Sequence, residues 1–180
     1  MRRDIAMCLV SIWLAGSLAM VFVAIQNFYT IDRLLEERYN ESFNATVEEL
    51  GPDRARELLR YLSSELNRQY FQWWNLSQLL IAVGTLILVY PVHSTKIRWA
   101  ILIMLFLVLF MTALITPQII TIGRGLDFIP RNPPPPELGT FGLLHAAYSL
   151  IDTIKTLLAG AVLICLHKED FKDNSFLQRH

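Results

Sequence analysis

Near the end of the sequence, an apolar segment carries polar side chains that could do chemistry. On an α-helix, residues three or four positions apart lie on the same face. This spacing predicts a polar stripe with two flanking residues: His145, Ser149, Asp152 and Thr156, with Tyr148 and Lys155 beside them. Because a charge that faces lipid costs about 2.5 kcal/mol or more, Asp152 and Lys155 should face the interior of a helix bundle or a wet cavity.

Three roles for this stripe are open. In the first, Asp152 and Lys155 neutralise each other, and the stripe hydrogen-bonds to neighbouring helices as structural support. Other apolar segments offer four polar partners for this role: Gln78, Thr112, Thr116 and Gln118. In the second, the stripe lines a small pocket or a proton or ion path, with Asp152 and His145 as exchangeable groups. In the third, it docks against a partner protein within the membrane.

Outside the stripe, the sequence contains one scattered set of metal-binding side chains: Cys8, His93, Cys165 and His167. Two thiols and two imidazoles suit zinc or copper, but they lack the close spacing of a ligand motif. The sequence also has no CxxCH motif for haem, no nucleophile elbow, no phosphate-binding loop and no paired catalytic carboxylates. We therefore expect a non-enzymatic protein without a cofactor.

The elements that position these residues are predicted to be membrane-spanning helices. Of the 180 residues, 53% are hydrophobic, and a spanning helix needs about 20 mostly apolar residues. Four stretches qualify: residues 5–25, 71–90, 97–122 and 141–166. The first is too long for the apolar core of a signal peptide, so we expect an uncleaved span. Pro117 is expected to bend or end the third span. The predicted fold is an all-α four-transmembrane-helix bundle forming a single integral membrane domain, residues 1–180.

The polar segment between the first two spans, residues 26–70, has the pattern of a long extramembrane helical hairpin. Its first half has an apolar residue at every fourth position: Ile31, Leu35, Tyr39, Phe43 and Val47. Its second half has apolar residues three or four apart: Ala55, Leu58, Leu62, Leu66 and Tyr70. The sequence Gly-Pro-Asp at residues 51–53 predicts the turn between the halves. We expect two long helices that leave the membrane and pair through these two stripes.

The charges suggest an orientation and exclude one class of partner. Lys plus Arg and Asp plus Glu number 16 each, so no basic excess is present to bind nucleic acid. Basic residues gather on one side of the predicted spans: Arg2, Arg3, Lys96, Arg98, Lys168, Lys172 and Arg179. By the positive-inside rule, both termini are expected in the cytoplasm of a bacterial inner membrane, with the hairpin outside. The expected partners are the lipid bilayer and either a membrane protein or a second copy of the chain.

Three stretches resemble the transmembrane protein 205-like family, a group of small four-span membrane proteins with a domain of unknown function. The stretch FGLLHAAYSLIDTIKTLLAG is similar to its last-helix signature through Phe141, His145, Ser149 and the position of Asp152. TPQIITIGRGLDFIP resembles the proline-bearing end of its third span, and IWLAG resembles its first helix. The chain departs from the family in having Asp152 where Asn is usual, in Lys155, and in a longer hairpin. The resemblance implies a four-helix membrane protein without an established enzymatic activity.

Together these features predict an interaction or accessory subunit of a membrane, whose polar stripe packs in the bundle or against a partner. One alternative is a small carrier or an ion or proton permeation component that uses His145, Asp152 and Lys155. A second alternative is a metal- or haem-binding membrane protein.

Overall fold

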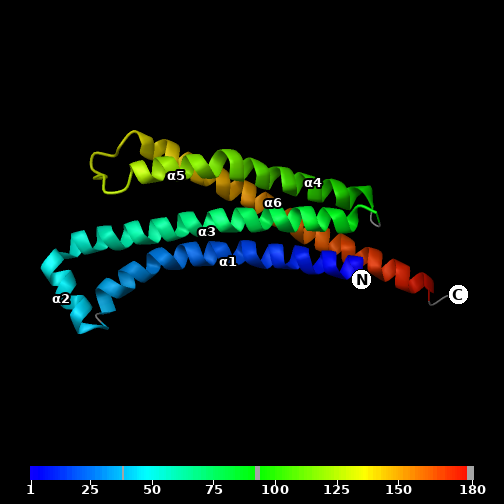
Figure 1. Cartoon of the computed structure of the whole chain (residues 1–180), viewed down its shortest axis with the longest axis horizontal. Helices are drawn as coiled ribbons and strands as arrows, with labels where there is room; N and C mark the ends of the chain where they lie inside the picture. Colours follow the sequence, from blue (N-terminus) through cyan, green and yellow to red (C-terminus); the bar gives the residue numbers. More distant parts are fainter. Residues whose placement is uncertain (38, 92–93, 178–180) are drawn as a thin grey trace.

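The computed structural model describes residues 1–37, 39–91 and 94–177, with side chains described up to residue 169. Seven helical elements follow one another in this part of the chain, which contains no β-strand (Figure 1). In order they are α1 (Arg2–Glu37), α2 (Glu41–Leu50), α3 (Pro52–Val89), α4 (Thr95–Phe110), the π-helix η1 (Met111–Ile115), α5 (Thr116–Gly125) and α6 (Glu137–Leu177). The all-α prediction is confirmed for these residues.

Four helical stretches are long and apolar enough to cross a membrane, as expected of an integral membrane protein. They are Arg2–Glu37, Pro52–Val89, Thr95–Gly125 and Glu137–Glu169. The start of α1, the end of α3, the start of α4 and the end of α6 lie at one end of the molecule, and α2 and the loop from α5 to α6 lie at the other (Figure 1). This arrangement places Arg2, Arg3 and Lys168 at the same end as Lys96 and Arg98 (Figure 1).

Pro117 does not end the third span. The chain widens into η1 just before it, and α5 then continues to Gly125 with Pro117 in its first turn. A proline has no N–H to donate and its ring collides with the carbonyl four residues earlier, so a wider π-turn relieves both problems. Ile115 and Thr116, although adjacent, are both buried. Thr116 thereby brings a hydroxyl into the bundle.

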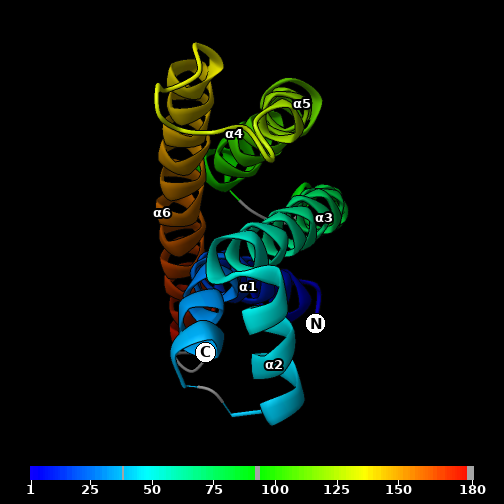
Figure 2. The ribbon, with the colours of Figure 1, turned by 90° about the vertical axis from the view of Figure 1, so that its left-hand side faces the viewer.

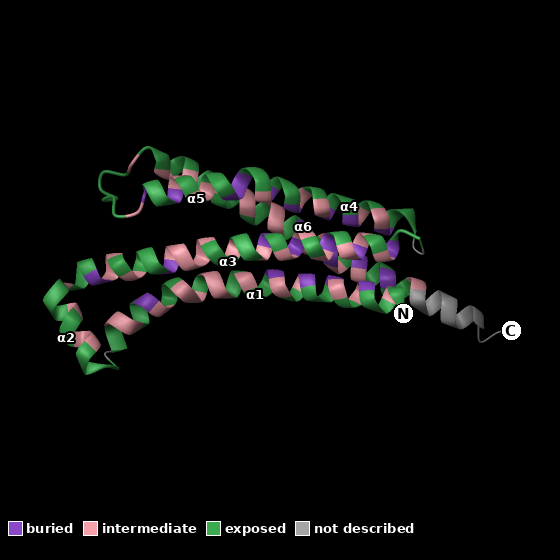
Figure 3. Ribbon diagram, viewed as in Figure 1, coloured by how far each residue is buried: buried purple, intermediate pink, exposed green. Residues whose placement is uncertain are grey.

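The apolar core lies toward the end that holds the termini, where α1, α3, α4 and α6 pack together. Its buried residues are Ala6, Val10, Trp13, Ala82, Val89, Ile97, Ile101, Met104, Val108, Ala159, Val162 and Leu166. Figure 3 shows few buried positions beyond this region, on the side of α2. Viewed from the end that carries α2, the pair α1 and α3 lies apart from the pair α5 and α6 (Figure 2). The bundle is therefore tightly packed at one end and splayed at the other.

The segment between the first two spans is helical but differs from the predicted hairpin in one arm. The first arm breaks after Glu37, and Asn40 starts α2 by accepting a 2.9 Å hydrogen bond from the Phe43 backbone N–H. Asparagine favours this N-cap position over a helix interior, which explains the break. The second arm starts at Pro52 as predicted, after Gly51 with its positive φ of 82°.

The predicted apolar stripe of the second arm is wrong for most of its members. Leu58, Leu62 and Tyr70 are exposed, whereas Ala55 and Ser63 face α1. Polar groups join the two arms instead. The Ser63 hydroxyl donates to the Asn27 carbonyl at 3.0 Å, and the side-chain amides of Asn27 and Asn67 bond at 2.6 Å. These hydrogen bonds fix how α1 and α3 are aligned against each other. In this alignment Leu58, Leu62 and Tyr70 point away from α1.

Candidate functional site

The central feature of the bundle is a buried polar network that starts from the stripe on α6. The Lys155 side chain is completely buried, and its Nζ lies 2.5 Å from Oδ1 of Asp152, which is 18% exposed. Nζ also donates a hydrogen bond to Oε1 of Gln78 on α3. The two opposite charges therefore neutralise each other inside protein, with a neutral amide as the third member.

Gln78 is the hub of this network. Its Oε1 also accepts a 2.8 Å hydrogen bond from the indole N–H of Trp13 on α1. Its Nε2 donates at 3.4 Å to Asn75, whose Oδ1 accepts from the Tyr148 hydroxyl at 3.0 Å. Asn75 in turn donates to the Thr116 hydroxyl of α5 at 2.9 Å. We call Trp13, Asn75, Gln78, Thr116, Tyr148, Asp152 and Lys155 the polar network. It connects α1, α3, α5 and α6.

The predicted stripe is divided between this network and the surface. Tyr148, Asp152 and Lys155 join the network, whereas His145 and Ser149 are exposed and Thr156 is half-buried. The ring Nδ1 of His145 lies 3.2 Å from the Phe141 carbonyl, one turn earlier on the same helix. The expectation of shielded charges thus agrees with the structure, but the stripe does not act as a single unit.

The predicted partners on other helices also divide. Gln78 and Thr116 belong to the network, Gln118 is exposed, and the hydroxyl of Thr112 is buried without a hydrogen-bond partner in the described part of the chain. Sequence reasoning missed Trp13 and Asn75. The sequence did offer a signal for Asn75: an amide side chain within a predicted apolar span must find a hydrogen-bond partner inside the protein.

A cavity of about 400 Å³ lies beside the network, in the splayed half of the bundle. Residues of α1, α3, α5 and α6 line it: Val21, Ala24, Ile25, Phe28, Ser64, Asn67, Arg68, Phe71, Thr116, Ile119, Ile120, Phe141, His145, Tyr148 and Ser149. Most of these side chains are apolar. Tyr148 and Thr116 connect the cavity wall to the polar network, and His145 is the only member of the predicted exchangeable pair that reaches it.

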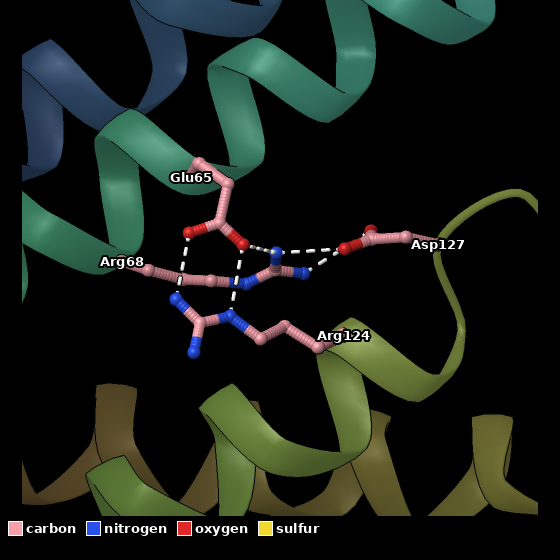
Figure 4. A network of polar contacts seen from close by, with 4 residues as sticks. All are labelled: Glu65, Arg68, Arg124 and Asp127. Carbon is pink, nitrogen blue, oxygen red and sulfur yellow. Dashed lines mark hydrogen bonds and ion pairs between the residues drawn. The ribbon is translucent and has the colours of Figure 1, made fainter.

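An ionic cluster links the same helices beyond the cavity (Figure 4). Arg68 of α3 pairs with Asp127 at 2.7 Å and with Glu65 at 2.6 Å, and Glu65 pairs with Arg124 of α5 at 2.9 Å. These residues lie outside the predicted apolar spans. Hydrogen bonds from Arg124, and then from Arg68, lower the pKa of Glu65 from 4.5 to about 2.

The ionic cluster depends on a close approach at Gly123. A Cβ added there would lie 2.9 Å from the Phe141 ring and 3.0 Å from the Arg68 guanidinium. No sequence pattern pointed to Glu65, Arg68 or Asp127, because the cluster joins positions 59 residues apart. We infer that it holds α3 against the start of the loop after α5.

The scattered metal-binding set is not brought together in the described part of the chain. Cys8, Cys165 and His167 are exposed, and His93 lies outside the described residues. No group of three or more His, Cys, Asp or Glu residues within the described ranges has the geometry to hold a metal ion.

Comparisons with known proteins gave no match: no family model, no curated protein and no solved structure matches the chain. The resemblance to the transmembrane protein 205-like family therefore remains a prediction.

Proposed function

We propose that this chain is a non-enzymatic integral membrane protein that acts as an interaction or accessory subunit. The acting part is the head, which we define as residues 26–37 of α1, residues 39–51 with α2, and residues 52–70 of α3. The observation that carries the proposal is the exposed apolar surface of the head. Its large exposed side chains, between 38% and 74% exposed, are Phe28, Tyr29, Tyr39, Leu50, Leu58, Tyr61, Leu62 and Tyr70.

These side chains lie beyond the predicted apolar spans, so hydrocarbon does not cover them. Exposed apolar groups of this number are typical of surfaces that bind another protein or a membrane. The segment of residues 26–70 has nine acidic residues and six arginines. An acidic surface is repelled by anionic lipid headgroups, so the head is better suited to a protein partner, either a membrane protein or a second copy of the chain.

The polar network supports the same conclusion by giving a structural role to Tyr148, Asp152 and Lys155, half of the six residues of the predicted stripe and its flanks. Lys155 and Asp152 are occupied with each other and with Gln78. The groups of the network join four helices and give the head a rigid base.

We further propose that the membrane is a bacterial inner membrane, with both termini in the cytoplasm and the head on the opposite side. Arg2, Arg3, Lys96, Arg98 and Lys168 favour this orientation, because cytoplasmic ends of spans carry an excess of basic residues. Membership of the transmembrane protein 205-like family is a further proposal, and the assignment of an interaction role does not depend on it.

The test is the mass of the intact particle extracted in native lipid nanodiscs, compared with a head variant. We expect wild type to carry a second copy or a distinct protein. The double variant Leu58→Ser/Leu62→Ser should lose this partner and keep its thermal stability, because both side chains are exposed. Gln69→Ser, an exposed polar change on the same helix, serves as the matched control. A wild-type particle that contains one chain and no other protein would contradict the proposal.

A small carrier or permeation component is a second candidate function, favoured by the position of His145 on the cavity wall. The cavity meets the polar network at Tyr148 and Thr116, so a proton or small ion that entered beside His145 would reach hydrogen-bonded groups. Proteoliposome flux measurements test this function. Flux that survives replacement of His145, Asp152 and Lys155 together would exclude a path through these groups.

A further inference from the structure

The cavity in the splayed half of the bundle has a side opening. Its exposed lining residues all lie on two helices: Val21, Ile25 and Phe28 on α1, and His145 and Ser149 on α6. The lining residues of α3 and α5 are half-buried or buried. This distribution favours an opening between α1 and α6.

The depth of this opening in the bilayer determines which molecules can enter the cavity. Along α3 the cavity runs from Ser64 to Phe71, about 10 Å at 1.5 Å per residue. Ser64 precedes the second apolar span, whereas Phe71 is its first residue. On α1, Val21 and Ile25 belong to the first apolar span. The upper part of the cavity thus lies at the level of the lipid headgroups, and the lower part faces the hydrocarbon of one leaflet.

The chemistry of the lining matches an amphipathic molecule. The lower wall is mostly apolar, through side chains such as Ile25, Phe71 and Ile120. His145 interrupts it: its Nδ1 faces the Phe141 carbonyl, and its Nε2 has no hydrogen-bond partner among the described residues. An imidazole nitrogen without a partner at the edge of hydrocarbon is unfavourable. A polar group of a bound molecule can satisfy it.

The charges near the cavity select against a strongly anionic headgroup. The ionic cluster contributes Arg68 and Arg124, but Glu65 and Asp127 neutralise both. A polar but uncharged group is therefore a better partner for His145 than an anionic one. The ester groups of a bilayer lipid are polar and uncharged, and they lie at the border between headgroups and hydrocarbon, the level at which we place His145. The volume of about 400 Å³ is in the range of pockets that bind small ligands.

From these observations we propose that the cavity binds one acyl chain of a bilayer lipid. The chain enters between α1 and α6, packs against Phe71 and Ile120, and places its ester group beside His145. The cavity shares Phe28, Ser64, Asn67 and Arg68 with the base of the head. Its test changes Ala24 or Val21, which lie outside the head, and leaves Leu58 and Leu62 as they are. The proposal is therefore tested independently of the protein partner.

The test is photo-crosslinking in vesicles of phosphatidylcholine that contain a small fraction of the same lipid with a photoactivatable group in one acyl chain. Mass spectrometry then locates the labelled residues. In wild type we expect label at Phe71 and Tyr148, whose rings meet edge to face on the cavity wall with their centroids 5.5 Å apart. We also expect label at Leu80, an exposed position further along α3.

Two matched variants separate the cavity from the outer surface. Ala24→Phe places a ring in the cavity, whereas Ala19→Phe makes the same change at an exposed position of α1. We expect Ala24→Phe to lower the label at Phe71 about tenfold. This is the loss of affinity expected when about two methylene groups of the acyl chain no longer contact the cavity wall. The label at Leu80 should persist, and Ala19→Phe should behave as wild type.

If Ala24→Phe fails to fold, Val21→Trp narrows the opening from an exposed position and should give the same selective loss. Equal labelling of Phe71 in wild type and in the folded cavity variant would overturn the proposal. Wild-type label confined to outer positions such as Leu80 would overturn it as well.

Discussion

The pair Asp152 and Lys155 allows a double-mutant test of the structural role of the polar network. In Lys155→Met, the Asp152 carboxylate loses its cation, and Gln78 keeps only the hydrogen bond from Trp13 at its Oε1. In Asp152→Asn, the ammonium group of Lys155 stays completely buried beside neutral groups. Removing one partner of a buried ion pair costs about 3–5 kcal/mol of unfolding free energy.

The two single variants should not be equal. Asp152 is 18% exposed and Lys155 is not exposed at all, so the orphaned carboxylate retains more solvation than the orphaned ammonium. We expect Lys155→Met near the lower end of that range and Asp152→Asn near the upper end. The double variant Asp152→Asn/Lys155→Met leaves no buried charge, so it should lose only about 1–2 kcal/mol, from the hydrogen bond to Gln78 and imperfect packing.

The assay is the unfolding free energy in bicelles by steric trapping, with Thr156→Val as the control. Thr156 belongs to the same stripe, is half-buried and makes no hydrogen bond to another described side chain, so its variant should change stability by less than about 1 kcal/mol. A double variant as unstable as the sum of the two single variants, about 6–10 kcal/mol, would refute the pairing that the structure shows.

Two further predictions concern helix packing and pH. A Cβ at Gly16 would lie 2.1 Å from the Trp74 ring, so Gly16→Ala should lower the unfolding free energy by about 1–3 kcal/mol. Gly160→Ala, with no atom within 4 Å of the added carbon, should leave it unchanged or raise it by up to about 1 kcal/mol, and equal shifts in the two variants would contradict the packing of α1 on α3. The pKa of Glu65 is lowered from 4.5 to about 2, so its ion pairs contribute their full stability above pH 4.5 and lose it as the pH falls toward 2. Unfolding measured across this pH window should therefore show a weaker pH dependence in Glu65→Gln than in wild type, and identical profiles would argue against the ionic cluster.

The helical architecture could be predicted because it depends on local properties of the chain. Four apolar runs of sufficient length predict four helices, since every backbone polar group in a bilayer must be satisfied within its own segment. The turn before Pro52 was predicted for a similar reason: proline and glycine impose their own backbone geometry. The need of Asp152 and Lys155 for shielding also follows from their chemistry alone.

Local rules misjudged the elements where two requirements compete. Of the two outcomes expected at Pro117, an end of the span is wrong, because η1 accommodates the proline and the helix continues to Gly125. Apolar spacing predicted that Leu58 and Leu62 pair with α1, yet hydrogen bonds from Ser63 and Asn67 determine the register. In both places, hydrogen bonding outweighed the pattern of residue types.

The sequence by itself determined that this protein has four apolar helices, an intervening polar segment and a charged pair that needs cover. Only the tertiary structure decided which side chains pair with these charges and shield them from lipid. Lys155 meets Gln78 across 77 positions, and Arg68 meets Asp127 across 59. The physical reason is that helical periodicity defines the face of one helix, whereas the helix opposite that face, and the level at which two side chains meet, depend on how all the helices pack together.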